Sequence, residues 1–111
     1  MTDTALKVKG MDSEQFRFGE FTIDTGRASL TRGGAAVALR PKSFALLEYL
    51  VRRAGTLVGK DELLGALWAG VVVTDDSLTR CISEVRAALR DSSQQIIKTV
   101  ARRGYLFDAP L

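Results

Sequence analysis

The sequence predicts an α+β domain in which a four-stranded antiparallel sheet precedes three helices and a C-terminal β-hairpin. Three observations predict this fold. Short alternating apolar segments fill residues 15–39, apolar side chains recur at helical spacing between residues 41 and 90, and two β-rich segments flank Gly104. At 111 residues the chain is most economically one domain, large enough to bury a core without disulfides or metal.

The first part of the chain predicts a leader and then a small sheet. Residues 1–14 show no sustained period, so we expect a flexible leader before a domain over residues 15–108, with a tail at residues 109–111. The four strands are marked by the apolar pairs Phe16 and Phe18, Phe21 and Ile23, Ala28 and Leu30, and Val37 and Leu39. Such a sheet cannot stand alone, so its apolar face is expected to pack on the helices.

Two helices are predicted next. Pro41 suits a first helical turn, apolar residues then repeat at helical spacing, and Gly55 ends the segment. Residues 57 and 58 form a brief extended link to a shorter helix over residues 60–68. The sequence AGVVV at residues 69–73 joins this helix to a third.

The third helix, predicted over residues 74–90, has an apolar side and a sparse polar side. Its apolar stripe consists of Leu78, Ile82, Val85 and Leu89, and the opposite side carries Asp76, Arg80, Ser83 and Ala87. A helix fits the major groove of DNA when short side chains permit approach and a few long ones reach base edges. Ser83 and Ala87 permit approach and Arg80 can reach; the alternative is that Arg80 is only a solvated charge.

Positive charge is concentrated in the last third of the chain. Residues 80–103 hold six basic and two acidic residues, a net charge of +4, whereas the remaining residues sum to −1. Within this segment Arg102 and Arg103 stand at the tip of the predicted hairpin, where they repel each other and gain nothing locally. The pattern favours a basic face for a polyanion, and a solvated turn is the alternative for the two arginines.

The composition argues against other classes of function. Cys81 is the only cysteine and the chain has no histidine, so we expect no disulfide, metal site or cofactor. At the edge of the apolar stripe, Cys81 is expected to be a small apolar filler, with a redox sensor as the alternative. Without histidine, paired acids or a glycine-rich phosphate loop, no enzyme is expected. With no membrane span or signal peptide, this segment is expected to be cytoplasmic and to make no membrane contact, although a longer protein could be anchored.

Five segments in this order and spacing carry a specific signal. They are residues 16–21 (FRFGEF), 39–42 (LRPK), 60–64 (KDELL) with Trp68, 73–78 (VTDDSL) and 99–105 (TVARRGY). Together they resemble the OmpR/PhoB-type DNA-binding domain, a winged helix-turn-helix, and most closely its ToxR/CadC-like branch, which carries the domain at the N-terminus. The resemblance spans about residues 15–108. It implies the double-stranded DNA-binding domain of a bacterial-type transcriptional regulator.

The resemblance also implies roles for individual residues. Base readout is expected from Ser77, Arg80, Cys81 and Glu84, where Glu84 either accepts from cytosine or screens Arg80 and holds its rotamer. Contacts to the DNA backbone or minor groove are expected from Trp68, Ser83, Arg86, Thr99, Arg102 and Arg103. The loop expected to contact RNA polymerase comprises Ala69, Gly70, Val71, Val72, Val73 and Thr74, although its valines could equally be buried. Paired binding of family members to half-sites implies a homodimer on DNA.

Two departures and one alternative function accompany the resemblance. Ala101 stands where this branch often has proline, and Leu106 stands where many members have a basic residue, so the wing is expected to be less rigid and to lack one phosphate contact. The main alternative is a protein-interaction winged helix without direct DNA readout, in which the apolar loop at residues 69–73 binds a partner.

Overall fold

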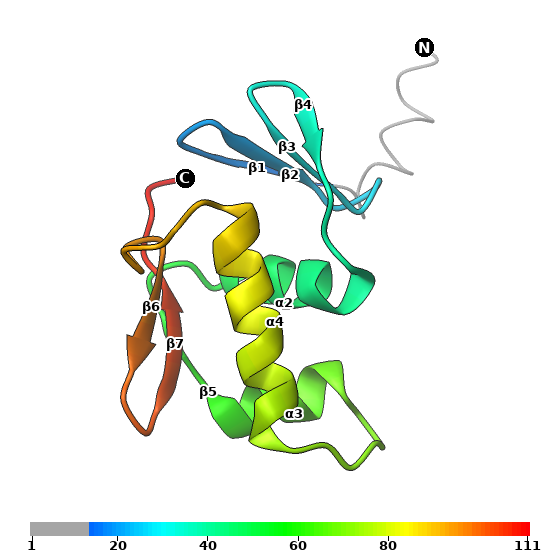
Figure 1. The fold of residues 1–111 in the computed structure, drawn as a ribbon, viewed down its shortest axis with the longest axis vertical. Coiled ribbons are helices and arrows are strands. Elements are labelled where there is room, and N and C mark those ends of the chain that lie inside the picture. The colour runs from blue at the N-terminus through cyan, green and yellow to red at the C-terminus, as the bar shows by residue number, and fades with distance from the viewer. Residues whose placement is uncertain (1–13) are drawn as a thin grey trace.

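A computed structural model describes residues 14–111, and in it the predicted order of elements is confirmed (Figure 1). The elements are β1 (Gln15–Phe18), β2 (Phe21–Asp24), β3 (Ser29–Arg32), β4 (Ala35–Val37), α2 (Pro41–Arg52), β5 (Leu57–Gly59), α3 (Lys60–Leu67), α4 (Asp75–Ala88), β6 (Ile97–Val100) and β7 (Gly104–Phe107). Residues 1–13 of the expected leader lie outside the described residues. None of the helices formed by residues 14–111 has the length and apolarity needed to cross a membrane.

The first four strands form an antiparallel sheet in sequential order, packed at one end of the helices (Figure 1). In its register Ile23 lies between Phe16 of β1 and Leu30 of β3, so one face gathers the apolar side chains. Glu14 belongs to the folded part, because its carbonyl accepts from the Thr25 amide at 2.9 Å. The apolar face packs on the rest of the core as predicted: the Phe18 and Phe107 rings meet edge to face with centroids 4.9 Å apart.

The C-terminal hairpin is larger than predicted, because β5 joins it in a three-stranded sheet of order β5-β7-β6. Residues 57 and 58, expected to be only a link, pair with Leu106 and Tyr105 of β7. Three residues are too few for an alternating pattern to distinguish a strand from an extended link, so only tertiary packing reveals the pairing. The wing is therefore hydrogen-bonded to the segment that leads directly into α3.

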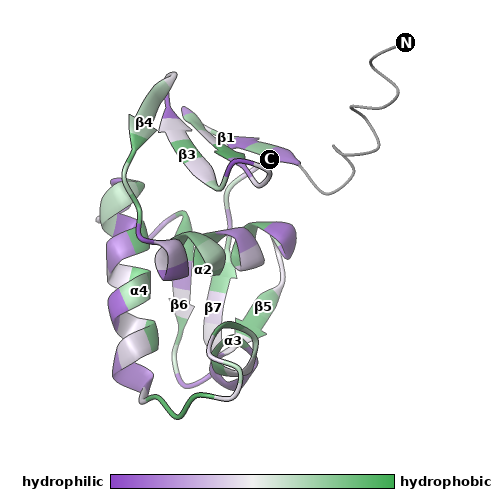
Figure 2. Cartoon of the chain, turned by 90° about the vertical axis from the view of Figure 1, so that its right-hand side faces the viewer, coloured by the Kyte–Doolittle hydropathy of each residue, from purple (hydrophilic) through white to green (hydrophobic). Residues whose placement is uncertain are grey.

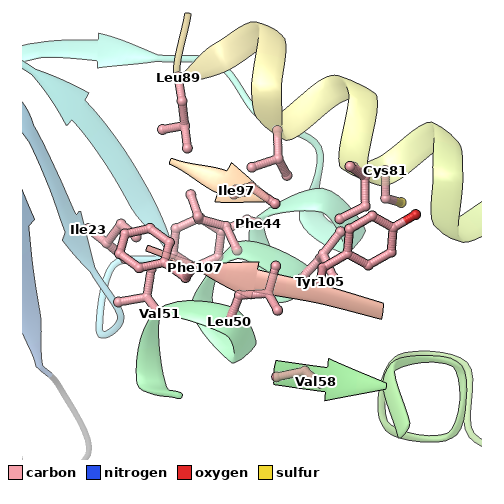
Figure 3. Close-up of a cluster of buried hydrophobic side chains, with 14 of the residues drawn as sticks. Ile23, Phe44, Leu50, Val51, Val58, Cys81, Leu89, Ile97, Tyr105 and Phe107 are labelled. Carbon is pink, nitrogen blue, oxygen red and sulfur yellow. The ribbon is translucent and has the colours of Figure 1, made fainter. Parts of the chain in front are cut away.

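The helices enclose a single core together with strands from both sheets (Figure 3). Each member of the predicted α4 stripe is at most 2 % exposed, which confirms the orientation of this helix. The helix is shorter than predicted: Thr74 is its N-cap without a side-chain cap bond, and Arg90 lies beyond its end with φ of 56°. With its inner side fixed, α4 turns its other side outward.

Candidate nucleic-acid interface

The outward side of α4 carries short side chains around one long cation. Thr79, Arg80, Ser83 and Ala87 are all exposed, opposite the buried stripe. Among residues 14–111, Arg80 makes no hydrogen bond or ion pair, so its guanidinium is available to an external ligand. Arg80 thus has the outward orientation that base readout requires.

The tip of the wing lies at the same end of the molecule as the first turns of α4 (Figures 1 and 2). Arg102 and Arg103 are exposed in the turn between β6 and β7, and Arg102 adopts a φ of 66°. Gly104 follows with its Cα packed against β5, where a Cβ would lie 1.9 Å from the Val58 carbonyl oxygen. The hairpin therefore presents the two arginines at the end of the molecule where α4 begins.

Arg86, expected to contact the DNA backbone, is half-buried and makes a structural contact within the protein. Its Nε and Nη2 donate to the Ile97 carbonyl at 3.1 and 2.7 Å, and Nη2 also donates to Thr99 Oγ1 at 2.7 Å. A guanidinium that forks onto neighbouring acceptors holds them in fixed geometry. Arg86 therefore ties α4 to β6, and the Thr99 hydroxyl, also expected to contact DNA, is one of its acceptors.

The structural role of Asp91 was not predicted from the sequence, where this residue entered only as a negative charge. It is 3 % exposed, and its carboxylate accepts from the amides of Gln95, Ile96 and Ile97 at 2.7, 3.0 and 2.9 Å. An aspartate just after a helix end is a turn-forming residue, and this was the available signal. Asp91 fixes the entry into β6 and, with Arg86, sets where the wing lies relative to α4.

Glu84 pairs with Arg40 and Ser43 and makes no bond to Arg80, whose screening was one of the two alternatives for this residue. Arg40 Nε donates to Glu84 Oε1 at 3.1 Å, Arg40 Nη2 bonds to Oε2, and Ser43 Oγ donates to Oε1 at 2.6 Å. The Arg40 hydrogen bonds, and after them the Ser43 bond, hold the pKa of the Glu84 carboxyl below its usual value. The helical wheel could not show this contact, because Arg40 and Ser43 are brought to α4 by the packing of α2.

Cys81, expected at base edges from the resemblance, is in the core. The thiol residue is 5 % exposed, and Figure 3 shows it beside Tyr105. This agrees with the expected role as a small apolar filler at the edge of the stripe. With only 5 % of its surface exposed, Cys81 offers a base pair little to contact.

A hollow of about 490 Å³ lies where α2, the end of α3 and α4 meet. It is lined by Arg40, Pro41, Lys42, Trp68, Ser77, Arg80 and Cys81. Lys42 Nζ lies 5.3 Å from the centroid of the half-buried Trp68 ring and donates to the Leu67 carbonyl. Four residues expected to contact DNA, Trp68, Ser77, Arg80 and Cys81, thus line one hollow, together with two cations, Arg40 and Lys42, that were not among the expected contacts.

The loop between α3 and α4 is apolar and solvent-exposed (Figure 2). Val71 is 60 % exposed and Val72 is fully exposed, whereas Val73 is half-buried. The sequence left open whether these valines are buried or exposed; Val71 and Val72 lie outside the core.

Comparison with known proteins identifies the type of domain. Residues 34–107 match the family model described as "Transcriptional regulatory protein, C terminal". The chain is 34 % identical over 102 residues to the transcriptional regulator HilA of Salmonella typhimurium, covering 91 % of this chain and 18 % of HilA. It is 30 % identical over 104 residues to the transcriptional activator CadC of Escherichia coli, covering 91 % of this chain and 20 % of CadC. The chain thus spans about a fifth of the length of these relatives.

Solved structures give the same result. The DNA-binding domain of RstA from Klebsiella pneumoniae, in complex with the RstA box, matches with a TM-score of 0.76 and 35 % identity over 86 % of this chain and 97 % of that one. The DNA-binding domain of E. coli CadC matches with a TM-score of 0.75 and 29 % identity over 88 % and 95 %. The chain therefore belongs to the family of transcriptional regulatory protein C-terminal domains, winged helix-turn-helix domains of the OmpR/PhoB type.

Proposed function

We propose that this chain is the sequence-specific, double-stranded DNA-binding domain of a transcriptional regulator, with α4 in the major groove and the wing at residues 99–105 on the minor groove or backbone. The observation that carries the proposal is the exposed, unpaired Arg80 on a face of short side chains, with Arg102 and Arg103 at the same end of the molecule. The RstA domain, similar in fold and sequence, is bound to its DNA box, which supports the same role here.

Within this proposal the side chains divide into base-reading and backbone-contacting groups. Arg80 makes a bidentate contact with guanine, the commonest specific contact in the major groove, and Ser77 lies one turn before it. The indole N–H of Trp68 and the Ser83 hydroxyl contact phosphates. Cys81 and Glu84 are left out of the base-reading group, because Cys81 is buried and Glu84 is paired with Arg40. Arg86 and Thr99 are left out of the backbone-contacting group, because they are bonded to each other.

The test separates base readout from phosphate contact. A bound sequence is first selected from a random DNA pool, and dissociation constants are then measured for that duplex and a scrambled duplex between about 50 and 200 mM salt. Arg80→Ala is expected to cost about 1–3 kcal/mol on the selected duplex and little on the scrambled one. Arg102→Ala is expected to weaken binding to both and to lower the salt slope by about one.

A half-buried arginine outside the proposed interface provides the control. Arg32 lies in the N-terminal sheet and pairs with Glu20 at 3.5 Å, so Arg32→Ala removes the same charge at the other end of the molecule and should leave both constants unchanged. Equal losses on the two duplexes for Arg80→Ala would refute base readout by this residue. Repeated half-sites among the selected sequences would support a homodimer on DNA.

We also propose that residues 69–74 contact a protein partner, RNA polymerase in the first instance, because Val72 offers a fully exposed apolar side chain there. Val72→Ser is expected to reduce transcription from a target promoter while leaving DNA affinity unchanged. Loss of DNA affinity in this variant would refute a separate role for the loop. If the wild-type domain fails to bind any duplex at about 50 mM salt, the alternative of a protein-interaction domain without DNA readout is favoured.

A further inference from the structure

Arg40, which precedes α2, is positioned at the edge of the proposed DNA-binding face by a contact from α4 itself. Two of its nitrogen atoms, Nε and Nη2, bond to the two carboxylate oxygens of Glu84. Glu84 is in turn fixed by Ser43, which is fully buried and donates to Oε1 at 2.6 Å. The direction of the Arg40 side chain is therefore set through Glu84 by a group inside the core.

The position of Arg40 brings it close to the outward side of α4. It lines the hollow that contains Trp68, Ser77 and Arg80, and a second hollow that contains Glu84 and Ala87. Arg80 and Ala87 are exposed residues of the α4 face on either side of Glu84. A DNA strand that follows this face would therefore pass the Arg40 guanidinium.

The guanidinium keeps the capacity to bind an anion while it is paired. Its side chain is 70 % exposed, although Glu84 is only 35 % exposed. A guanidinium has five N–H donors. The contact with Glu84 uses Nε and Nη2 along one edge, so the N–H groups of Nη1 remain available to an anion. An ion pair this exposed contributes little to stability, so its main consequence is to fix orientation.

We propose that Arg40 is a DNA-backbone contact of this domain, a phosphodiester-binding residue that Glu84 and Ser43 hold beside α4. This inference rests on the proposed function and adds to it a contact from outside the recognition helix and the wing. It also gives Glu84 a role as a positioning residue in place of base readout.

The first test measures the salt dependence of binding to the selected and scrambled duplexes. Arg40→Ala should weaken binding to both about tenfold, the value of one charge-assisted hydrogen bond, and reduce the salt slope by about 0.9. Arg40→Lys keeps the charge and should preserve the slope. The control Arg32→Ala removes an arginine that is likewise paired with a glutamate, far from α4, and should change neither quantity.

Several outcomes would overturn the phosphate contact. These are an unchanged slope for Arg40→Ala, an equal change for Arg32→Ala, or a slope for Arg40→Lys as low as that for Arg40→Ala. Thermal denaturation of each variant shows whether it is folded. Failure of the wild-type domain to bind DNA would instead refute the proposed function, so the two failures are distinguishable.

A double-mutant cycle tests whether Glu84 positions Arg40. The loss caused by Arg40→Ala is measured in the wild type and again in Glu84→Gln, where the charge that holds the guanidinium is absent. Coupled residues give non-additive effects, so the loss should fall from about tenfold to less than about threefold in the second background. A loss that is as large or larger there would overturn the positioning role, whatever the effect of Glu84→Gln alone.

Discussion

Asp91 shows how much one side chain contributes to this fold, since three backbone amides depend on its carboxylate. Asp91→Ala is expected to destabilise the domain by about 2–4 kcal/mol, because the buried Ile97 amide and two partly buried amides would lose their acceptor and keep their desolvation cost. Urea denaturation measures the change. Asp108→Ala is the control: Asp108 is an exposed aspartate that pairs with Lys98, and its loss should cost less than about 1 kcal/mol. Similar losses in the two variants would contradict the special role of Asp91.

Gly104 is required by close packing between β7 and β5. In Gly104→Ala the new Cβ would lie 1.9 Å from the Val58 carbonyl oxygen, and φ is 154°, so a loss of about 3 kcal/mol or more is expected. Gly65, within α3, has no atom within 4 Å of an added Cβ, and Gly65→Ala should stabilise the domain by about 0.5–1 kcal/mol. The denaturation midpoints of the two variants should therefore move in opposite directions; a shared direction would be inconsistent with this account.

At the scale of elements, two contacts fix α4 between its neighbours. Glu84 joins it to α2 through Arg40 and Ser43, and Arg86 joins it to β6 through Ile97 and Thr99. The helix α4 and the wing thus keep a fixed relative position before any ligand binds. Prearranged contacts reduce the ordering cost that binding must otherwise overcome.

The contact between α2 and α4 makes a predictable contribution to acid sensitivity. Because the folded state lowers the pKa of Glu84, chiefly through Arg40, the stabilisation is present at neutral pH and is lost as pH falls below 4.5 towards the lowered pKa. Urea denaturation between about pH 3 and 7 should show a smaller fall in stability for Glu84→Gln than for the wild type. Equal pH dependence in the two proteins would show that Glu84 has the same pKa in the folded and unfolded states.

At the scale of the whole molecule, the N-terminal sheet and the helical part share one core. Phe18 contacts Phe107 edge to face, and both side chains are at most 2 % exposed. Phe18→Ala should therefore destabilise the whole domain by about 3–5 kcal/mol. The fluorescence of Trp68, the single tryptophan, and far-ultraviolet circular dichroism should report the same urea midpoint. Separate midpoints would show that the sheet unfolds independently.

The sequence by itself determined the order of the elements, the buried stripe of α4 and the outward direction of Arg80. These features depend on local periodicity, which a helix of known pitch converts directly into faces. It also located Arg102 and Arg103 at a turn, because β-rich segments with a glycine between them define a hairpin.

Only the tertiary structure decided which of these residues remain free to bind. Arg86 and Glu84 lie on α4 as expected, but Arg86 is bonded to β6 and Glu84 is bonded to Arg40 and to Ser43 of α2. Arg40, which joins the proposed interface, lies 44 residues before Glu84 in the sequence. The pairing of β5 with β7 likewise joins segments that no local pattern relates. The physical reason is that a hydrogen-bond partner is chosen by how elements pack against one another, and packing is set by the whole core.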